Sequence, residues 1–274
     1  MTAEARAASP FIHEGPPSPR RTFADALRLV VTYPKACLGP LYAVSLPAAL
    51  FTAVGTLVLY GTVFRDKEIV HPAEIISDGD RAQQLWLALF VGIEALFALV
   101  ARGAAIVSIA AAAGGKRVEL KLALDPAFTR MGGLLLIVAL MAAGAAALGL
   151  IIIGVPIAVY LLIRFAIVFD VYMLEGKAPG AVFGRAWNLT KGRMLALTGT
   201  LALGLLAVVP VYIFASALAA ISGGDRALQL SLIASLGVVQ SLLLVPAFGM
   251  STALTTLFYL NLKANEHEYG RYAA

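Results

Sequence analysis

Long runs without a charged residue constrain this chain more than any other feature. Residues 36–64 form an uncharged run of 29 residues, and 131–163 form another of 33. About 20 apolar residues are enough for a helix to cross the hydrocarbon core of a bilayer. The runs are rich in Ala and Leu and lack the alternation of about ten residues that is typical of membrane strands. The sequence therefore predicts an all-α, polytopic membrane helix bundle.

The composition excludes the common soluble classes. Hydrophobic residues make up 60% of the 274 positions and charged residues 14%, whereas soluble domains average about 45–50% and about 25%. One aqueous core cannot bury so much apolar surface. A soluble enzyme, a nucleic-acid binder, a disordered chain and a disulfide scaffold are therefore excluded as descriptions of the whole chain. The single cysteine, Cys37, allows no internal disulfide.

Six spans are predicted from the charge-free runs. Pro40 and Pro47 in the first span favour a kink, and we expect a turn at 154–156 between the third and fourth. The second span ends at about 101 or continues to 113 as one long helix. The expected spans are 36–64, 85–101 or 85–113, 133–153, 157–174, 194–216 and 228–260.

The domain organisation is expected to be simple. Residues 21–263 form a single integral membrane domain, between a flexible N-terminal tail at 1–20 and a C-terminal tail at 264–274. The N-terminal residues lack the pattern of a cleaved signal peptide.

Lys and Arg are distributed unevenly between the loops. The N-terminal segment, the 114–131 and 175–193 loops and the C-terminus together carry 15 of the 21 cations, and the loops between them carry four. Cytoplasmic loops are enriched in Lys and Arg. We therefore expect a multi-pass protein of the plasma or inner membrane with both termini in the cytoplasm.

Three short amphipathic segments each precede a pair of spans. Each carries apolar residues at helical spacing and ends in cations, which favours a helix lying in the headgroup layer on the cytoplasmic side. The first is expected to begin with a capping box from Thr22 to Asp25. In the second, Pro126 favours a restart with Asp125 as cap, and the third begins at Pro179. Two explanations remain open: the three segments are copies of an internal repeat, or they show the pattern that any membrane protein with short basic loops gives.

Several short motifs carry a family resemblance. They are Arg164-Phe, Glu175-Gly176, the stretch Arg185-Ala-Trp-Asn-Leu-Thr-Lys-Gly192, and the ending Leu257-Phe-Tyr-Leu-Asn-Leu-Lys263. Together they resemble the membrane-domain family of bacterial glycerophosphoryl diester phosphodiesterases, over residues 20–268.

This chain departs from the family pattern at three positions: Ala186 stands where the family has Ser, Asn261 where it has Asp, and Lys263 where it has Arg. The last two remove a potential acid–base pair. The chain has no room for a catalytic barrel of about 250 residues. The resemblance therefore implies a stand-alone, uncharacterised membrane domain without phosphodiesterase activity.

Four ionisable residues in or beside the spans are candidates for function, because charge in lipid is costly. Glu94 and Arg164 have similar predicted depths, so we expect them to form an ion pair between spans two and four. That pair would be either a polar gate or headgroup site, or a contact that fixes helix register. Arg102 is expected to snorkel to the cytoplasmic surface. Asp170, and Glu175 nearer the surface, are expected to pair with Lys177 or a neighbouring Arg.

A second set of candidates lies at the predicted membrane surface. Arg185 suits a lipid phosphate and Trp187 suits the interfacial belt, with Lys191 and Arg193 beside them. His13, His71 and His267 are isolated, and the sequence contains no zinc, phosphate-loop or nucleophile-elbow motif. We expect no catalytic residue, metal or cofactor.

The leading functional hypothesis is a non-enzymatic structural or accessory membrane protein that binds lipid headgroups and a partner protein of unknown identity. The alternative is a small transporter or lipid-translocating protein with a polar path near Glu94 and Arg164. An intramembrane enzyme that uses Glu94 or Asp170 is a third option. Membrane lipids are the expected partners, and nucleic acid is not.

Overall fold

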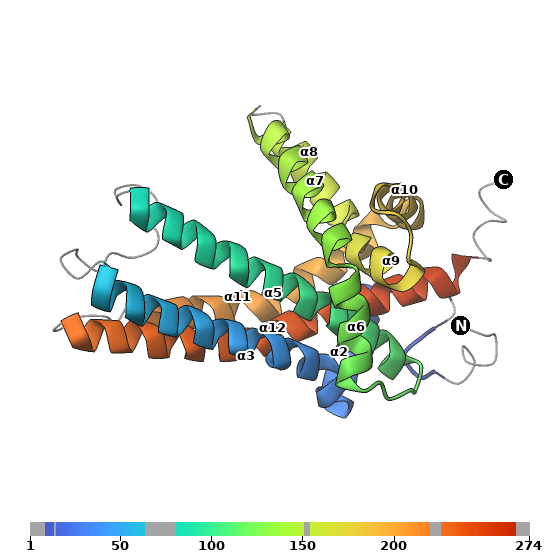
Figure 1. Cartoon of the computed structure of the whole chain (residues 1–274). Coiled ribbons are helices and arrows are strands. Elements are labelled where there is room, and N and C mark those ends of the chain that lie inside the picture. Colours follow the sequence, from blue (N-terminus) through green and yellow to red (C-terminus); the bar gives the residue numbers. More distant parts are fainter. Residues whose placement is uncertain (1–8, 14, 64–80, 151–153, 220–225, 267–274) are drawn as a thin grey trace.

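The computed structural model describes residues 9–13, 15–63, 81–150, 154–219 and 226–266, and every regular element in these ranges is helical (Figure 1). The predicted all-α fold class is confirmed. The α-helices are α2 (Pro19–Thr32), α3 (Pro34–Val58), α5 (Arg81–Ala113), α6 (Leu120–Thr129), α7 (Met131–Gly149), α8 (Gly154–Arg164), α9 (Val168–Glu175), α10 (Pro179–Thr190), α11 (Met194–Ala219) and α12 (Arg226–Ala264). A π-helical turn, η1 (Leu59–Val63), extends α3.

Six helical segments of the described chain are long and apolar enough to cross a membrane. They lie in α3 with η1, α5, α7, α8 with α9, α11 and α12. Side chains on their outer faces are apolar and exposed, as with Leu150 at 89% and Leu206 at 71%. Exposed apolar faces on spans of this length suit contact with lipid chains. The chain is therefore a multi-pass membrane protein.

The helices fall into three successive units, each with one short helix followed by two spans. The short helices α2, α6 and α10 lie at the same end of the molecule, on the right in Figure 1. Each buries a stripe of apolar residues against the bundle, such as Ala26 and Leu29 of α2. We call this end the basic end, because its exposed cations are Arg20, Arg21, Arg28, Lys35, Lys116, Arg117, Lys121, Lys177 and Lys191.

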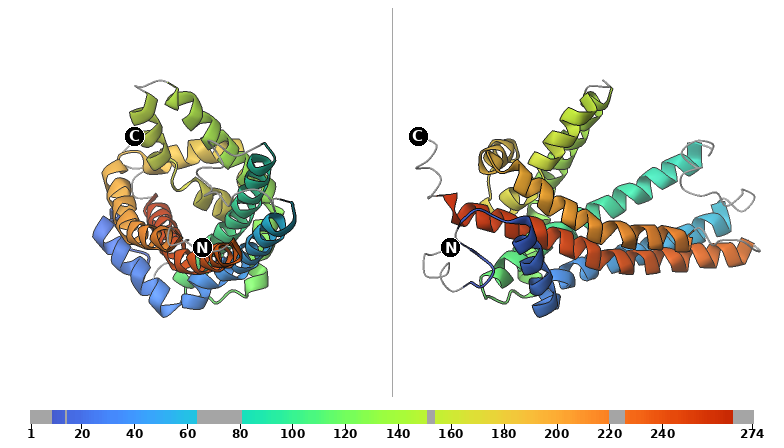
Figure 2. Two further views of the ribbon diagram at one scale, coloured as in Figure 1. Left: turned by 90° about the vertical axis from the view of Figure 1, so that its left-hand side faces the viewer. Right: turned by 180° about the vertical axis from the view of Figure 1, so that it is seen from behind.

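The spans do not all run in parallel. Helices α3, α5, α11 and α12 lie side by side, while the hairpin of α7 and α8 diverges from them (Figures 1 and 2). Helix α12 is central, since it packs against α2, α3, α5, α9 and α11. Its last turns are almost wholly buried, and Leu257, Phe258 and Tyr259 are each 0% exposed.

Three local predictions are wrong. Thr22 forms no capping box, because α2 already begins at Pro19 and the Thr22 hydroxyl donates to the Ser18 carbonyl at 3.0 Å. Helix α6 runs through Pro126 without a restart. No loop lies at 154–156, because these residues form the start of helix α8. The connection from α7 to α8 falls before them, and its residues 151–153 lie outside the described part of the chain.

The fourth span is also not the single helix that was predicted. Helix α8 ends at Arg164, and the chain passes through a tight turn at 165–167 in which the Val168 amide donates to the Phe165 carbonyl at 2.9 Å. Helix α9 then starts in a new direction. The break separates Arg164 from Asp170, which would otherwise lie on one continuous helix.

The N-terminal segment is not a free tail from residue 9 onward. Phe11 is 4% exposed, and the Ser9 hydroxyl donates to the Ala113 carbonyl at the end of α5. The His13 amide donates to Asn261 Oδ1 at 2.8 Å, and the Gly15 amide donates to Asn265 Oδ1 at 2.8 Å. Residues 9–13 and 15–18 therefore belong to the folded domain, which starts before the predicted boundary at 21.

Candidate functional site at the basic end

Helix α9 carries the acidic residues of the site and is fixed at its end by Arg130. This guanidinium donates to the carbonyls of Tyr172 at 3.2 Å and Met173 at 2.7 Å. The Tyr172 carbonyl also accepts from the Gly176 amide at 3.2 Å, and the Met173 carbonyl is one of the last four of the helix, which have no partner within it. The helix ends at Gly176, whose φ of +67° suits glycine. A Cβ there would also lie 3.1 Å from Arg130 Nη2. Sequence reasoning did not assign this role to Arg130.

The inner part of the site is a buried group around Asp170. This side chain is 0% exposed, and the Thr256 hydroxyl of α12 donates to its Oδ1 at 2.7 Å. Arg102 of α5 interacts electrostatically with Asp170 and lies with its Cζ 4.6 Å from the centre of the Phe169 ring. A guanidinium over an aromatic face is stabilised by the ring quadrupole. The inner group therefore joins α5, α9 and α12.

The structure bears on two sequence predictions here. Arg102 is half-buried over the Phe169 ring rather than extended at the surface. Asp170 faces an Arg, Arg102, and not Lys177, whereas Glu175 pairs with Lys177 at 3.2 Å and with Arg185 at 3.1 Å, as predicted for this residue. The spacing along the helix gave the depth of each charge but not the face on which it lies.

The outer part of the site is centred on Glu175, the last residue of α9. Tyr259 donates to Glu175 Oε1 at 2.9 Å, and Arg185 Nε lies 3.1 Å from Oε2. Lys177 and Lys263 lie 3.2 Å and 3.7 Å from its two oxygens. One carboxylate thus holds cations from α10, α12 and the loop after α9.

Arg185 also binds a second carboxylate. Its Nη2 donates to Glu266 Oε2 at 2.6 Å, and Nη1 pairs with Oε1 of the same group. The hydrogen bonds that Arg185 donates to Glu266 raise the pKa of Arg185 above its ordinary value, so this guanidinium stays charged. Arg185, predicted as a headgroup ligand, is therefore engaged by two carboxylates of the protein itself.

Arg164 and Trp187 join α8 to α10 beside this network. The Arg164 Cζ lies 3.4 Å from the centre of the Trp187 ring, and Nη2 donates to the Trp187 carbonyl at 3.2 Å. Nη1 donates to the Tyr160 hydroxyl. Trp187 remains 40% exposed, which suits an indole at the membrane surface.

The predicted contact between Glu94 and Arg164 is not made. Arg164 is 6% exposed and bonds to Tyr160 and Trp187, whereas Glu94 is exposed on α5. Within the described ranges, no hydrogen bond or ion pair joins the two residues. The polar path expected near them therefore lacks this pair.

The remaining surface candidates lie where α10 meets α11. Lys191 is exposed directly after α10, and Arg193 is half-buried one residue before α11. Trp187 and Lys191 are thus the members of the predicted interfacial set that present the most surface to a ligand.

The chemistry of the site is that of paired charges and hydrogen bonds. In the part of the chain that the structure describes, no group of three or more His, Cys, Asp or Glu side chains has the geometry of a metal site. Comparisons with family models, curated proteins and solved structures find no match for the chain.

Proposed function

We propose that this protein is a non-enzymatic accessory protein of the cell membrane, whose basic end lies at the cytoplasmic surface and binds the phosphates of anionic lipids. The observation that carries the proposal is the common placement of α2, α6 and α10 with the exposed cations around them. Amphipathic helices with basic flanks bind anionic headgroups. Cytoplasmic leaflets supply such lipids, and the positive-inside rule gives the same orientation.

The network around α9 supports an accessory role over transport. Glu175, Arg185 and Asp170 are held by groups of the protein itself. Such contacts fix how α9, α10 and α12 pack, which suits a scaffold that positions interfacial helices. The alternative, a transporter or lipid-translocating protein, was based on a path near Glu94 and Arg164, and these two residues lie apart.

The motif resemblance to the glycerophosphoryl diester phosphodiesterase membrane-domain family is part of the same proposal. The residues that carry it include Glu175 and Arg185, which pair with each other, and Trp187, which binds Arg164 beside them. The family pattern thus coincides with residues that fix α9 against α10. On this basis we infer a membrane domain of that family.

The two tryptophans of the sequence provide a test. Trp187 lies at the basic end, and Trp86 lies near the start of α5, at the opposite end. The variants W86F and W187F each leave one tryptophan. Both are reconstituted in two kinds of vesicle of phosphatidylglycerol and phosphatidylcholine. In one the phosphatidylglycerol carries bromine atoms, which quench tryptophan fluorescence, and in the other the phosphatidylcholine does.

We expect phosphatidylglycerol to be enriched about two- to fivefold around Trp187 and to match the bulk fraction around Trp86. A cation near an anionic surface contributes about 1 kcal/mol, which is about fivefold in local concentration. In the W86F protein, we expect K191Q to lower the enrichment of phosphatidylglycerol around Trp187. R81Q removes a cation at the start of α5, opposite the basic end, and should leave that enrichment unchanged. Equal quenching of both tryptophans by the anionic lipid contradicts the proposal.

A further inference from the structure

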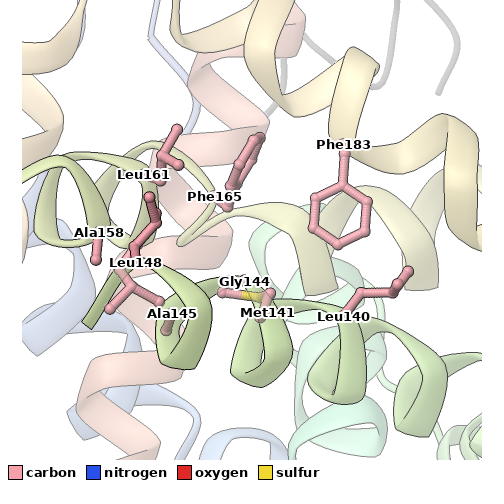
Figure 3. Close-up of a pocket in the computed structure, with 10 residues that line it drawn as sticks. Leu140, Met141, Gly144, Ala145, Leu148, Ala158, Leu161, Phe165 and Phe183 are labelled. Carbon is pink, nitrogen blue, oxygen red and sulfur yellow. The ribbon is translucent and has the colours of Figure 1, made fainter. Parts of the chain in front are cut away.

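A second feature of the basic end lies within the membrane rather than on the surface. A cavity of about 350 Å³ lies between α7, α8 and α10 (Figure 3). Its volume falls in the range of small-molecule sites, about 300–1,000 Å³. All of its lining residues are apolar, among them Leu140, Met141, Gly144, Leu161, Phe165 and Phe183.

Small residues open this cavity. Gly144 and Ala145 of α7 face Ala158 of α8 across the space, and a Cβ built at Gly144 meets nothing within 4 Å. Atoms that line an empty space lose their dispersion contacts on that side. In a bilayer, the apolar group at hand to restore those contacts is a lipid chain.

The cavity has the length and position of one acyl chain. From Leu140 to Leu148 it follows α7 for about 12 Å, at about 1.5 Å per residue. One leaflet of a bilayer is about 15 Å of hydrocarbon, half of a core of about 30 Å. Phe183 belongs to the short helix α10, and on α7 the lining runs from Leu140 to Leu148, well after its start at Met131. The cavity therefore begins beside α10 and extends along the hairpin away from the basic end.

A charged donor without a full set of partners lies beside the cavity. Arg164 directly precedes Phe165, which lines the cavity and packs edge-on against Phe183 with ring centres 5.2 Å apart. Arg164 is 6% exposed, and its Nε has no hydrogen-bond partner. Leaving a buried charged donor unpaired is costly, and a phosphate oxygen would satisfy it.

We propose that the cavity between α7, α8 and α10 holds one acyl chain of a phospholipid whose phosphate binds Arg164. This site goes beyond the proposed function, because it concerns one resident lipid at membrane depth and not the exposed cations. The Trp187 ring contacts both sides of this site: Arg164 lies over it, and Phe165 packs against it at a tilt with ring centres 6.2 Å apart.

The test measures lipid that stays bound after purification. The protein is extracted in a phosphorus-free detergent and passed over a gel-filtration column, and lipid phosphorus and native mass are then measured. We expect about one phospholipid per wild-type chain. G144L fills the cavity and lowers retention at least fivefold. The matched variant G149L adds the same side chain to an exposed part of α7 outside the cavity and retains lipid as the wild type does.

A second measurement needs no cavity variant, so it stands if G144L fails to fold. The W86F protein is incubated with phosphatidylglycerol that carries bromines in its chain, and unbound lipid is removed. Phe165, with its ring centre 6.2 Å from that of Trp187, places the cavity within quenching range. We expect about half of the Trp187 emission to be lost, and loss of this quenching in R164Q.

Wild-type protein that retains detergent but no phospholipid overturns this inference, as does equal retention by G144L and G149L. Absence of quenching in the W86F complex overturns it as well. These results are separable from the proposed function, because K191Q alters anionic enrichment in vesicles and leaves the lipid in the cavity in place. Either proposal can thus fail while the other holds.

Discussion

The guanidinium of Arg164 lies over the indole of Trp187, with its Cζ 3.4 Å from the ring centre, and so joins the end of α8 to α10. Arg164 also donates to the Trp187 carbonyl at 3.2 Å. A short apolar turn follows Arg164, so this contact holds the hairpin of α7 and α8 to the basic end. The stacked pair is therefore where the diverging hairpin is anchored.

Replacing Arg164 with Lys is expected to destabilise the protein by about 1–2 kcal/mol. A desolvated cation over an aromatic ring contributes about 2 kcal/mol, and Lys keeps the charge without the planar stack. Reversible unfolding in mixed micelles measures the change. R28K, on the exposed face of α2, is the matched control and should alter stability by less than about 0.5 kcal/mol. Equal effects of the two variants would exclude a stabilising stack.

The inner group predicts an energetic coupling between α5 and α9. D170N removes the charge that faces Arg102 and is expected to cost about 1–3 kcal/mol, because it leaves the half-buried guanidinium without its counter-charge. R102L removes that cation, so the double variant should be more stable than the sum of the single losses predicts. Unfolding of all four proteins gives the coupling energy, expected at about 1–3 kcal/mol. Additive losses would show that the two residues act independently.

Tyr259 provides a test of the outer group. Y259F removes the hydroxyl that donates to Glu175 at 2.9 Å, and a bond to a charged group contributes about 1.5–3 kcal/mol. Y42F removes an exposed hydroxyl that donates to the Leu242 carbonyl at 3.3 Å, so its effect should be below about 0.5 kcal/mol. Thermal unfolding of the wild type and of both variants under one set of conditions measures the loss of stability in each. A loss in Y42F as large as in Y259F would argue against the special role of Glu175.

The N-terminal segment predicts a local change in hydrogen exchange. Asn265 accepts from the Gly15 amide at 2.8 Å and donates to the His13 carbonyl at 3.0 Å. N265A should therefore release residues 9–13 and 15–18 and lower the protection of their amides about tenfold, while the bundle stays protected. N188A, on the exposed face of α10, should leave the segment protected. Unchanged exchange in N265A would mean that the other contacts of the segment, such as buried Phe11 and the bond from the His13 amide to Asn261, hold it without Asn265.

The spans could be predicted because they depend on a property that runs along the sequence. Charge-free runs gave the six spans, and apolar periodicity gave the short helices, including the start of α10 at Pro179. The break after Arg164 could not be found in this way. Apart from Arg164 itself, the residues on both sides of it are apolar, and neither Gly nor Pro marks the turn at 165–167.

The contacts between charges were harder to predict, because depth in a membrane does not fix the face of a helix. Glu94 and Arg164 have similar predicted depths but point to different surroundings. Arg102 stays inside because Phe169 and Asp170 reach it from α9, a helix whose direction depends on the unpredicted break. Residues 9–13 and 15–18 are docked by hydrogen bonds from the His13 and Gly15 amides to the side chains of Asn261 and Asn265. Single contacts of this kind produce no periodic pattern in the sequence.

The central claim is that α2, α6 and α10 share one side of the membrane, the cytoplasmic one, and cysteine labelling tests it most directly. In a C37A background, K116C places a thiol at the basic end and R81C places one at the opposite end. An impermeant maleimide is added to intact cells and, separately, to permeabilised cells. The account predicts that R81C is labelled in intact cells and K116C only after permeabilisation. Labelling of K116C in intact cells, or of both sites from the same side, would contradict it.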